Sequence, residues 1–185
     1  MTQVQRLQPQ LCMVRPDLQN LEPLQLPAGY SLRSFQAGDE LAWESIIAAS
    51  FERQDNPDKF ETRVRADPAY RPGRVLFIVC EGEPVATASA WHMPKYGPQT
   101  GCIHMVGVRP DHQGKRLGYL ASLAALYQFA AEGRTRALLE TDDYRLPAIK
   151  TYLNLGFEPL LVHENQRDRW RNILSALGVQ EKGAI

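Results

Sequence analysis

The chain has 185 residues, and its 21 Lys and Arg balance its 21 Asp and Glu, so the formal net charge is zero. Apolar residues make up 44% and charged residues 23%, which is typical of a globular protein and argues against wholesale disorder, a collagen-like repeat or a coiled-coil rod. The balanced charge gives no electrostatic reason to expect nucleic-acid or anionic-membrane binding. Three widely spaced cysteines favour free thiols in the cytoplasm, and no apolar stretch is long enough to span a bilayer.

Residues 1–28 differ from the rest of the chain because they carry six Gln and four Pro without a clear hydrophobic period. Proline at this spacing breaks helices and central strands, so an irregular or extended arm is predicted, followed by a single domain over residues 29–185. The scattered leucines of the arm favour a structural strap that lies against the domain. A partner-binding arm is the alternative.

Short apolar strands alternate with amphipathic helices through the remainder of the chain, which predicts an α/β fold. Strands are expected over residues 30–35, 75–80, 84–91, 102–108, 137–140 and 157–162. Helices are expected over residues 40–51, 57–66, 115–132, 146–155 and 164–177. The last helix has an apolar face that offers a homodimer contact.

The most informative segment is the turn Gln113-Gly114-Lys115-Arg116-Leu117-Gly118, between an apolar strand and a long helix. A helix N-terminus presents unpaired N–H groups and the positive end of a dipole, so it attracts anions. Glycine permits close approach of a ligand, and Lys115 and Arg116 add positive charge. The segment therefore suits a phosphate or pyrophosphate, although it matches neither the Walker A nor the dinucleotide-binding pattern.

A second motif lies further along, where Ala148, Tyr152, Gly156 and Phe157 fit the pattern A-x-x-x-Y-x-x-x-G-F. Together with the 113–118 turn, this pattern resembles the GNAT superfamily of N-acyltransferases, which use acetyl-CoA. The resemblance implies a mixed, mostly antiparallel sheet that is splayed between its fourth and fifth strands and flanked by helices. Two residues depart from the family pattern: Arg116 replaces a common glycine, and Arg145 stands where Asn is common. The helical tail also differs from the seventh strand of many relatives.

The resemblance further implies how acetyl-CoA, as co-substrate, would bind and react. The pyrophosphate would lie on the backbone amides of the turn and the first helical residues, and the pantetheine arm would follow the edge of the preceding strand. The N–H near Val106 would stabilise the oxyanion, an amine would attack directly, and Tyr152 would protonate the departing sulfur, unless its ring only packs in the core. The implied cofactor-binding residues are Val106, Gly107, Val108, Gln113, Gly114, Lys115, Arg116, Leu117, Gly118 and Tyr119.

The general base is open at this point. His104 precedes Val106 and Val108 by two and four residues, so strand alternation predicts that it shares their face. Glu140 ends the next strand and is the other candidate, and either residue could instead be a structural polar group. Asp142 and Asp143 are expected to cap the following helix, with binding of a cationic amine as the alternative. No cluster of residues has metal-ligand spacing.

The expected activity is transfer of an acetyl group to a primary amine of a small molecule or peptide in the cytoplasm. A catalytically silent acyl-CoA sensor of the same fold is the main alternative, and a protein-interaction domain that binds no nucleotide is a third. Neither a nucleic acid nor a membrane is expected as a partner.

Overall fold

The computed structural model describes residues 9–51 and 59–180. Within these ranges, seven strands form one sheet in the order β2-β3-β4-β5-β6-β1-β7. Every neighbouring pair is antiparallel except β5 and β6, which run parallel. The strands are β1 Leu11–Arg15, β2 Tyr30–Ser34, β3 Val75–Cys80, β4 Glu83–Trp91, β5 Thr100–Val108, β6 Arg136–Thr141 and β7 Glu158–Leu160.

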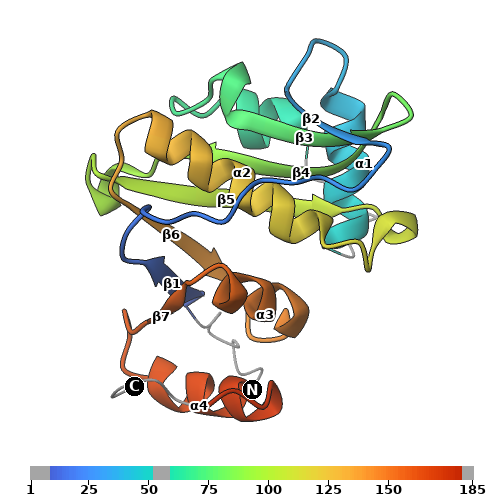
Figure 1. Ribbon diagram of the computed structural model, residues 1–185. Helices are drawn as coiled ribbons and strands as arrows, with labels where there is room; N and C mark the ends of the chain where they lie inside the picture. The colour runs from blue at the N-terminus through green and yellow to red at the C-terminus, as the bar shows by residue number, and fades with distance from the viewer. Residues whose placement is uncertain (1–8, 52–58, 181–185) are drawn as a thin grey trace, which may run out of the picture.

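Helices cover both faces of this sheet (Figure 1). The α-helices are α1 Glu40–Ser50, α2 Leu117–Ala131, α3 Leu146–Asn154 and α4 Gln166–Ala176. Short helical turns are η1 Glu61–Arg65, η2 Pro72–Arg74, η3 Pro94–Tyr96 and η4 Pro110–His112. Two apolar cores result, because α1 packs with Trp43 and Ile47 on one face and α2 packs with Leu123 and Phe129 on the other.

The sheet separates between β5 and β6, as the family resemblance implies. Their parallel register covers only Thr100–Ile103 against Arg136–Leu139, so the second half of β5 has no β6 partner. Antiparallel pairing with β4 holds the other edge of β5 in place beyond the separation. The fold class predicted from the sequence is confirmed. The separation of β5 from β6, which that fold class implies, lies beside the turn of residues 113–118.

The prediction of an irregular arm is wrong for Leu11–Arg15, which form β1 between β6 and β7. Leu11, Cys12 and Met13 are each at most 1% exposed, because both faces of this strand are covered. Four consecutive apolar residues, Leu11 to Val14, carried the signal of a buried strand, but the flanking prolines obscured it.

The segment that joins β1 to β2 runs across α2 and is blue in Figure 1. Leu18, Leu21, Leu24 and Leu26 are partly buried against the α2 side of the core. The backbone carbonyl of Glu22 also accepts a hydrogen bond from the α2 side chain Tyr127, at 2.9 Å. This segment is therefore the structural strap that the leucines predict.

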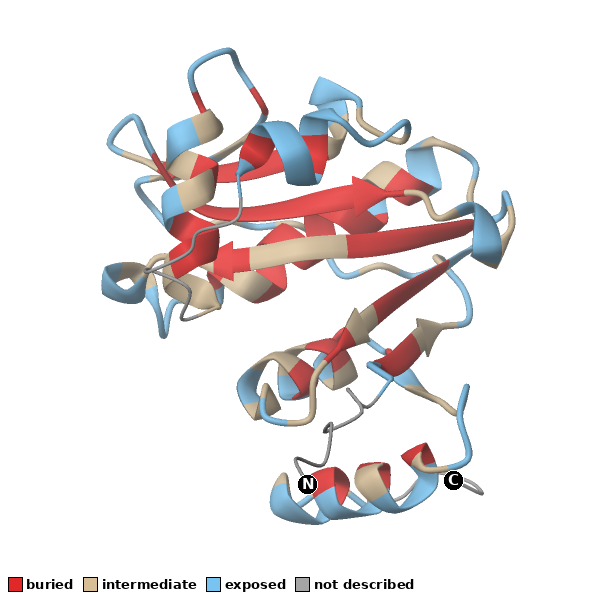
Figure 2. Cartoon of the chain, turned by 180° about the vertical axis from the view of Figure 1, so that it is seen from behind, coloured by how far each residue is buried: buried red, intermediate tan, exposed pale blue. Residues whose placement is uncertain are grey.

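The remaining helices differ from expectation in two ways. In place of the helix expected over residues 57–66, the structure has the single π-helical turn η1, and residues 57 and 58 lie outside the described ranges. The apolar face of α4, which the sequence offers for a dimer contact, is covered by the chain itself, since Trp170, Ile173 and Leu174 are at most 5% exposed. Figure 2 shows this buried side of α4 turned toward the sheet.

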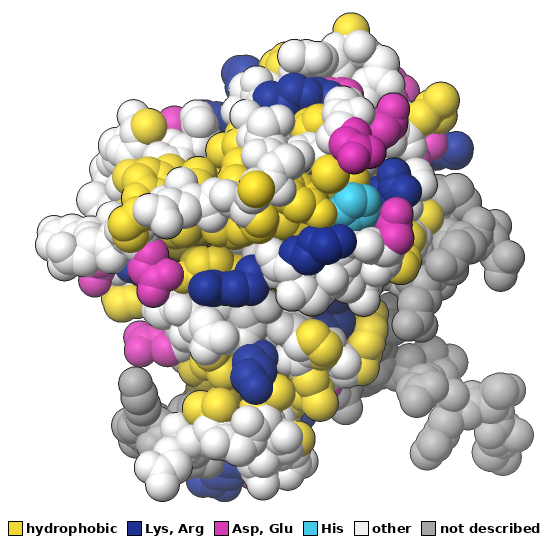
Figure 3. Space-filling view, turned by 45° about the vertical axis from the view of Figure 1, so that its right-hand side comes forward, with side chains coloured by type: hydrophobic (Ala, Val, Ile, Leu, Met, Phe, Trp, Pro, Cys, Tyr) yellow, Lys and Arg dark blue, Asp and Glu magenta, His cyan; other side chains and the backbone are white. Residues whose placement is uncertain are grey.

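On the face shown in Figure 3, Lys and Arg side chains lie in separate places among acidic and hydrophobic ones. Among the described residues, no helix combines the length and apolar character needed to cross a membrane.

Candidate active site

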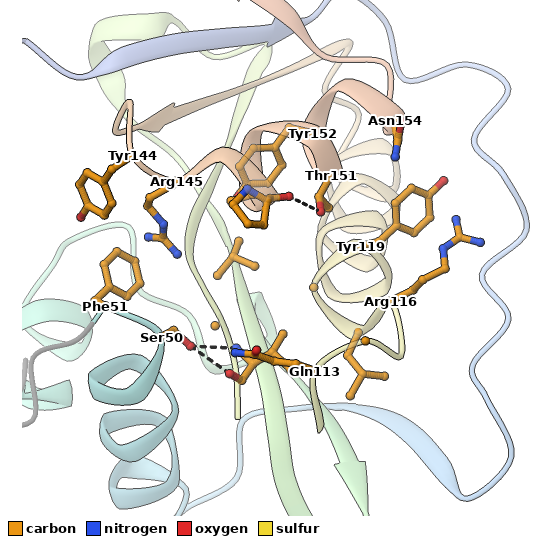
Figure 4. A pocket seen from close by; sticks show the side chains of 18 residues that line it. Ser50, Phe51, Gln113, Arg116, Tyr119, Tyr144, Arg145, Thr151, Tyr152 and Asn154 are labelled. Carbon is orange, nitrogen blue, oxygen red and sulfur yellow. Dashed lines mark hydrogen bonds between the residues drawn. The ribbon is translucent and has the colours of Figure 1, made fainter. Parts of the chain in front are cut away.

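Two cavities meet where β5 and β6 separate. The larger, of about 700 Å³, extends along the second half of β5, the N-terminus of α2 and one side of α3 (Figure 4). The smaller, of about 310 Å³, lies between β5, the end of β6 and the end of α1. The residues that line both are Phe51, Val106, Arg145 and Tyr152.

The predicted anion-binding turn borders the larger cavity. Gly114 and Arg116 have φ angles of 78° and 58°, so the chain turns through the left-handed region just before α2 begins. In the described part of the chain, no acceptor is found for the backbone N–H groups from Gly114 to Tyr119. Six neighbouring donors at a helix N-terminus form a site suited to a diphosphate.

Nine of the ten predicted cofactor-binding residues line this cavity, and Lys115 does not. The Lys115 ammonium instead donates to the backbone carbonyl of Asp111, at 3.3 Å. Arg116, which replaces a common glycine, places its guanidinium over the Tyr119 ring, 4.4 Å from the centroid. Tyr119 in turn donates a 2.6 Å hydrogen bond to Glu22 of the strap, so the strap also anchors the edge of this site.

A β-bulge interrupts β5 at the point where the two cavities meet. His104 pairs with Ser89 and Gly107 pairs with Thr87, so Met105 and Val106 together oppose one residue of β4. Met105 has a φ of 51°, which is the left-handed conformation that turns the strand. The bulge leaves Val106 without a partner in the β4 register, at the position where the sequence predicts an oxyanion donor.

The bulge also overturns the predicted face of His104. The His104 ring lies 5.9 Å from the Trp91 ring, on the side of the sheet covered by α1. Val106 and Val108 pack instead against the core on the α2 side. Alternation fails because the extra residue shifts the side-chain period by one position. His104 therefore lines the smaller cavity and lies across the sheet from Val108.

Ser50 is a site residue that the sequence did not reveal. Its Oγ accepts the Val108 N–H at 2.9 Å and donates to the Ile46 carbonyl at 2.7 Å. Gly107 permits this contact, because a Cβ there would lie 2.8 Å from Ser50 Oγ and 2.9 Å from Ile46. The end of α1 is thus fixed to β5, and the Val108 N–H is already occupied by a side chain.

Tyr152, on α3, faces the junction of both cavities with 7% of its surface exposed. Its ring packs edge-on against Phe157, with 6.1 Å between ring centroids. No hydrogen-bond partner for its hydroxyl is found in the part of the chain that the structure describes. Burial raises the pKa of Tyr152 to about 12, although the nearby positive charge of Arg145 acts in the opposite direction. The residue is therefore a neutral phenol with a proton available for donation.

Glu140 lies in the smaller cavity with His104, so both candidate bases line the same space. Its Oε1 accepts hydrogen bonds from Lys95 Nζ at 2.7 Å and from the Tyr96 hydroxyl at 2.6 Å. Burial acts to raise the pKa of Glu140, but these hydrogen bonds and the Lys95 charge lower it overall. Glu140 is thus an ionised carboxylate held in one orientation.

The expected capping role of Asp142 and Asp143 is wrong, because Arg145 is the N-cap of α3 and no side chain caps that helix. Asp143 binds Arg169 of α4 through both carboxylate oxygens. Asp142 accepts a hydrogen bond from Gln10 at 3.2 Å and lines the smaller cavity.

Cys102 also borders the smaller cavity, and burial raises its pKa to about 12. It is therefore a thiol rather than a nucleophilic thiolate. In the ranges that the structure describes, no group of three or more His, Cys, Asp or Glu side chains is placed to hold a metal ion.

A sequence model of the acetyltransferase (GNAT) family matches residues 40–157, which is more than half of the chain. The chain belongs to the GNAT acetyltransferase family. Members of this family use acetyl-CoA, and the matched residues include the turn, the bulged strand and Tyr152. After the roles proposed for them below, the larger cavity is called the donor cavity and the smaller one the acceptor cavity.

Curated relatives of this GNAT chain include two proteins named mycothiol acetyltransferase. The protein from Thermomonospora curvata is 29% identical over 163 residues, covering 80% of this chain and 53% of its own length. The protein from Pseudarthrobacter chlorophenolicus is 32% identical over 143 residues, covering 71% and 43%. The chain thus spans about half the length of the curated relatives it matches.

Solved structures share the fold. A GCN5-related N-acetyltransferase from Kribbella flavida is 27% identical with a TM-score of 0.54, covering 82% of this chain and 54% of the other. A GCN5-related N-acetyltransferase from Sphaerobacter thermophilus is 21% identical with a TM-score of 0.59, covering 83% and 50%. At 21% identity, the similarity to the Sphaerobacter thermophilus protein shows only that the two chains share a fold.

Proposed function

We propose that this chain transfers an acetyl group from acetyl-CoA directly to a primary amine of a small molecule or peptide. The observation that carries the proposal is the meeting of two cavities at Val106 and Tyr152. One cavity has free amides for a diphosphate, and the other has ionisable groups for an amine. Direct transfer needs both reactants at one junction, and Cys102 is not a thiolate that could carry the acetyl group between them.

Donor binding would depend mainly on the amides from Gly114 to Tyr119. Their positive helix end and unpaired N–H groups would hold the pyrophosphate without any additional charged residue. The cavity then continues along Val106 and Gly107 toward Tyr152, which gives the pantetheine arm a path to the junction. Because Ser50 already binds the Val108 N–H, we expect Val106 to be the main strand contact.

In the reaction, the amine nitrogen attacks the thioester carbonyl carbon. A C–N bond forms, the C–S bond breaks, and the Val106 N–H stabilises the negative oxygen of the tetrahedral intermediate. The Tyr152 hydroxyl donates its proton to the departing sulfur, and the products are an N-acetylated amine and coenzyme A. Burial keeps the Tyr152 hydroxyl protonated throughout the neutral range, so its proton is present when the sulfur departs.

The amine must lose a proton, and two groups of the acceptor cavity can receive it. We assign this step to His104, directly or through a water molecule, because imidazole exchanges protons readily near neutral pH. Glu140 is less basic, since its pKa is lowered and Lys95 binds its carboxylate. Its fixed negative charge is better suited to holding the incoming ammonium group.

The experiment combines calorimetric titration of acetyl-CoA with an assay of coenzyme A thiol release over a panel of primary amines. Binding together with thiol release and a matching increase in acetylated-amine mass supports the proposal. Binding without release on any amine would instead indicate the acyl-CoA sensor. No binding at millimolar acetyl-CoA would contradict both. The three cysteines, which are free thiols, support a cytoplasmic location for this activity.

A further inference from the structure

Arg145 stands at the boundary of the two cavities and has an unusual environment for an arginine. It is half-buried, and its guanidinium lies 3.9 Å from the centroid of the Phe51 ring. Figure 4 shows the side chain extending over Phe51 toward the cavity. Stacking uses only the flat face of the guanidinium, so the N–H groups around its edge stay available for an anion.

These N–H groups are unused in the described part of the chain. No ion pair or side-chain hydrogen bond of Arg145 is found there, whereas Arg169 binds both oxygens of Asp143. A partly buried arginine without an anion is costly, and a carboxylate is the group that fits its planar fork. Arg145 therefore has the features of a binding residue whose anion comes from outside the chain.

The charges of the acceptor cavity indicate which reactant brings that anion. Glu140 is ion-paired with Lys95, and Asp142 is the second carboxylate on the lining. Two arginines, Arg63 and Arg145, line the same cavity. The lining thus carries carboxylates as well as the guanidinium of Arg145, a combination that complements a zwitterion. The diphosphate of the donor has its own site on the amides of α2, so it does not require Arg145.

We propose that Arg145 binds a carboxylate of the acceptor, so that the substrates are amino acids or similar small amines with a carboxylate near the reacting nitrogen. The inference rests on the proposed acetyl transfer and specifies its substrate class. The volume of about 310 Å³ lies at the small end of ligand sites, which suits a compact acceptor. Arg145 contacts the acceptor and is a specificity residue, while Val106 and Tyr152 serve the reaction itself.

The test compares amines that differ only in the carboxylate. The pairs are tyrosine and tyramine, histidine and histamine, and lysine and cadaverine. A fourth pair, phosphoethanolamine and ethanolamine, forms the phosphate arm, which tests whether a phosphate is recognised instead of a carboxylate. The wild-type protein is expected to have kcat/KM at least tenfold higher for the carboxylate member of one or more pairs. Arg145→Gln is expected to remove most of that preference, and Arg145→Lys to retain part of it. The control Arg167→Gln removes one positive charge from the exposed side of α4 and leaves the preference unchanged.

Four results would overturn the assignment. Equal kcat/KM within every pair, or a preference only in the phosphate arm, would exclude carboxylate recognition. If Arg145→Gln lowers kcat/KM equally for both members of a pair, Arg145 would act in the reaction itself rather than in carboxylate recognition. A change of more than about threefold in the acetyl-CoA Kd of Arg145→Gln would make Arg145 a donor-binding residue.

Acceptor binding can also be measured in the absence of turnover, so this inference can be tested even if the proposed acetyl transfer fails. The same amine pairs are titrated into protein saturated with coenzyme A, so that acceptor binding is measured without reaction. Tighter binding of the carboxylate members, lost in Arg145→Gln, would uphold the carboxylate site even if acetyl transfer failed. No difference in affinity within any pair would refute it.

Discussion

Replacement of Tyr152 by Phe tests the proposed role of the hydroxyl as general acid without disturbing the packing of the ring. The substitution removes one hydroxyl and keeps the ring, which packs against Phe157 in the core. Since the hydroxyl has no partner among the described residues, no intramolecular hydrogen bond is lost. We expect the free energy of unfolding to change by less than about 1 kcal/mol.

The effect on rate is expected to be much larger. With a pKa of about 12, the phenol is almost fully protonated near neutral pH, so the wild-type protein always has its acid in the active form. A thiolate is already a fair leaving group, because an alkyl thiol has a pKa of roughly 8.5. Loss of the acid should therefore lower kcat by about 100-fold, the low end for general acid catalysis, equivalent to about 2.7 kcal/mol.

The assay measures coenzyme A thiol release at saturating amine, with acetyl-CoA affinity determined separately by calorimetry. Because the proton of Tyr152 is retained up to high pH, its titration should cause no fall in the wild-type kcat between pH 7 and about 10. Tyr127→Phe is the matched control, since it removes a tyrosine hydroxyl bound to the strap outside both cavities. A kcat within threefold of wild type in Tyr152→Phe would refute the acid role. A fall in kcat equal to that of the control would do the same.

Three further substitutions test the donor site, the core and the acceptor cavity. Gly118→Glu should abolish the increase in Tm caused by acetyl-CoA, because it places a negative charge beside the amides that would hold the diphosphate. Gly101→Ala should lower the free energy of unfolding by about 3 kcal/mol in a urea titration, since its Cβ would lie 2.3 Å from the buried ring of Phe129. Glu140→Gln should weaken the dependence of Tm on acidification: the pKa of this carboxylate is lowered by folding, so its contribution is present above about pH 4.5 and is lost as the pH falls further.

Each of these substitutions has a matched control variant, which tests the physical reason given for its effect. Gly118→Ala should keep acetyl-CoA binding, because the added Cβ meets Val108 at an ordinary 3.5 Å. Gly73→Ala adds a methyl group in open space and should leave stability unchanged. Glu158→Gln removes an exposed carboxylate on β7 and should keep the wild-type response to acid. If a substitution and its control variant have the same effect, the reason given for that substitution is wrong.

Local sequence was sufficient to locate the proposed donor site, because the groups proposed to bind there are consecutive backbone amides. A strand, a glycine-containing turn and a helix that follow one another present their amides together, whatever the rest of the fold does. Nine of the ten residues predicted to bind the cofactor line the larger cavity, and Tyr152, which the second motif predicts, lines it as well. The side chains of Lys115 and Arg116 were less predictable, since Asp111 and Tyr119 compete for them.

The acceptor side could not be derived in this way. One extra residue at Met105 moved His104 to the other face of the sheet, and nothing in the local pattern marks that bulge. The contact of Ser50 with Val108 joins residues 58 positions apart, and Lys95 reaches Glu140 across 45 positions. Such contacts exist only when separate segments have been brought together.

The amino-acid sequence alone thus determined the family, the splayed α/β sheet and the position of the turn proposed to bind the diphosphate, because these depend on short-range periodicity and on backbone geometry within one segment. Only the tertiary structure placed β1 between β6 and β7, turned His104 toward the acceptor cavity and left Arg145 without an anion among the described residues. These features depend on strand register and on side chains that meet across long sequence separations, and local pattern carries no information about either.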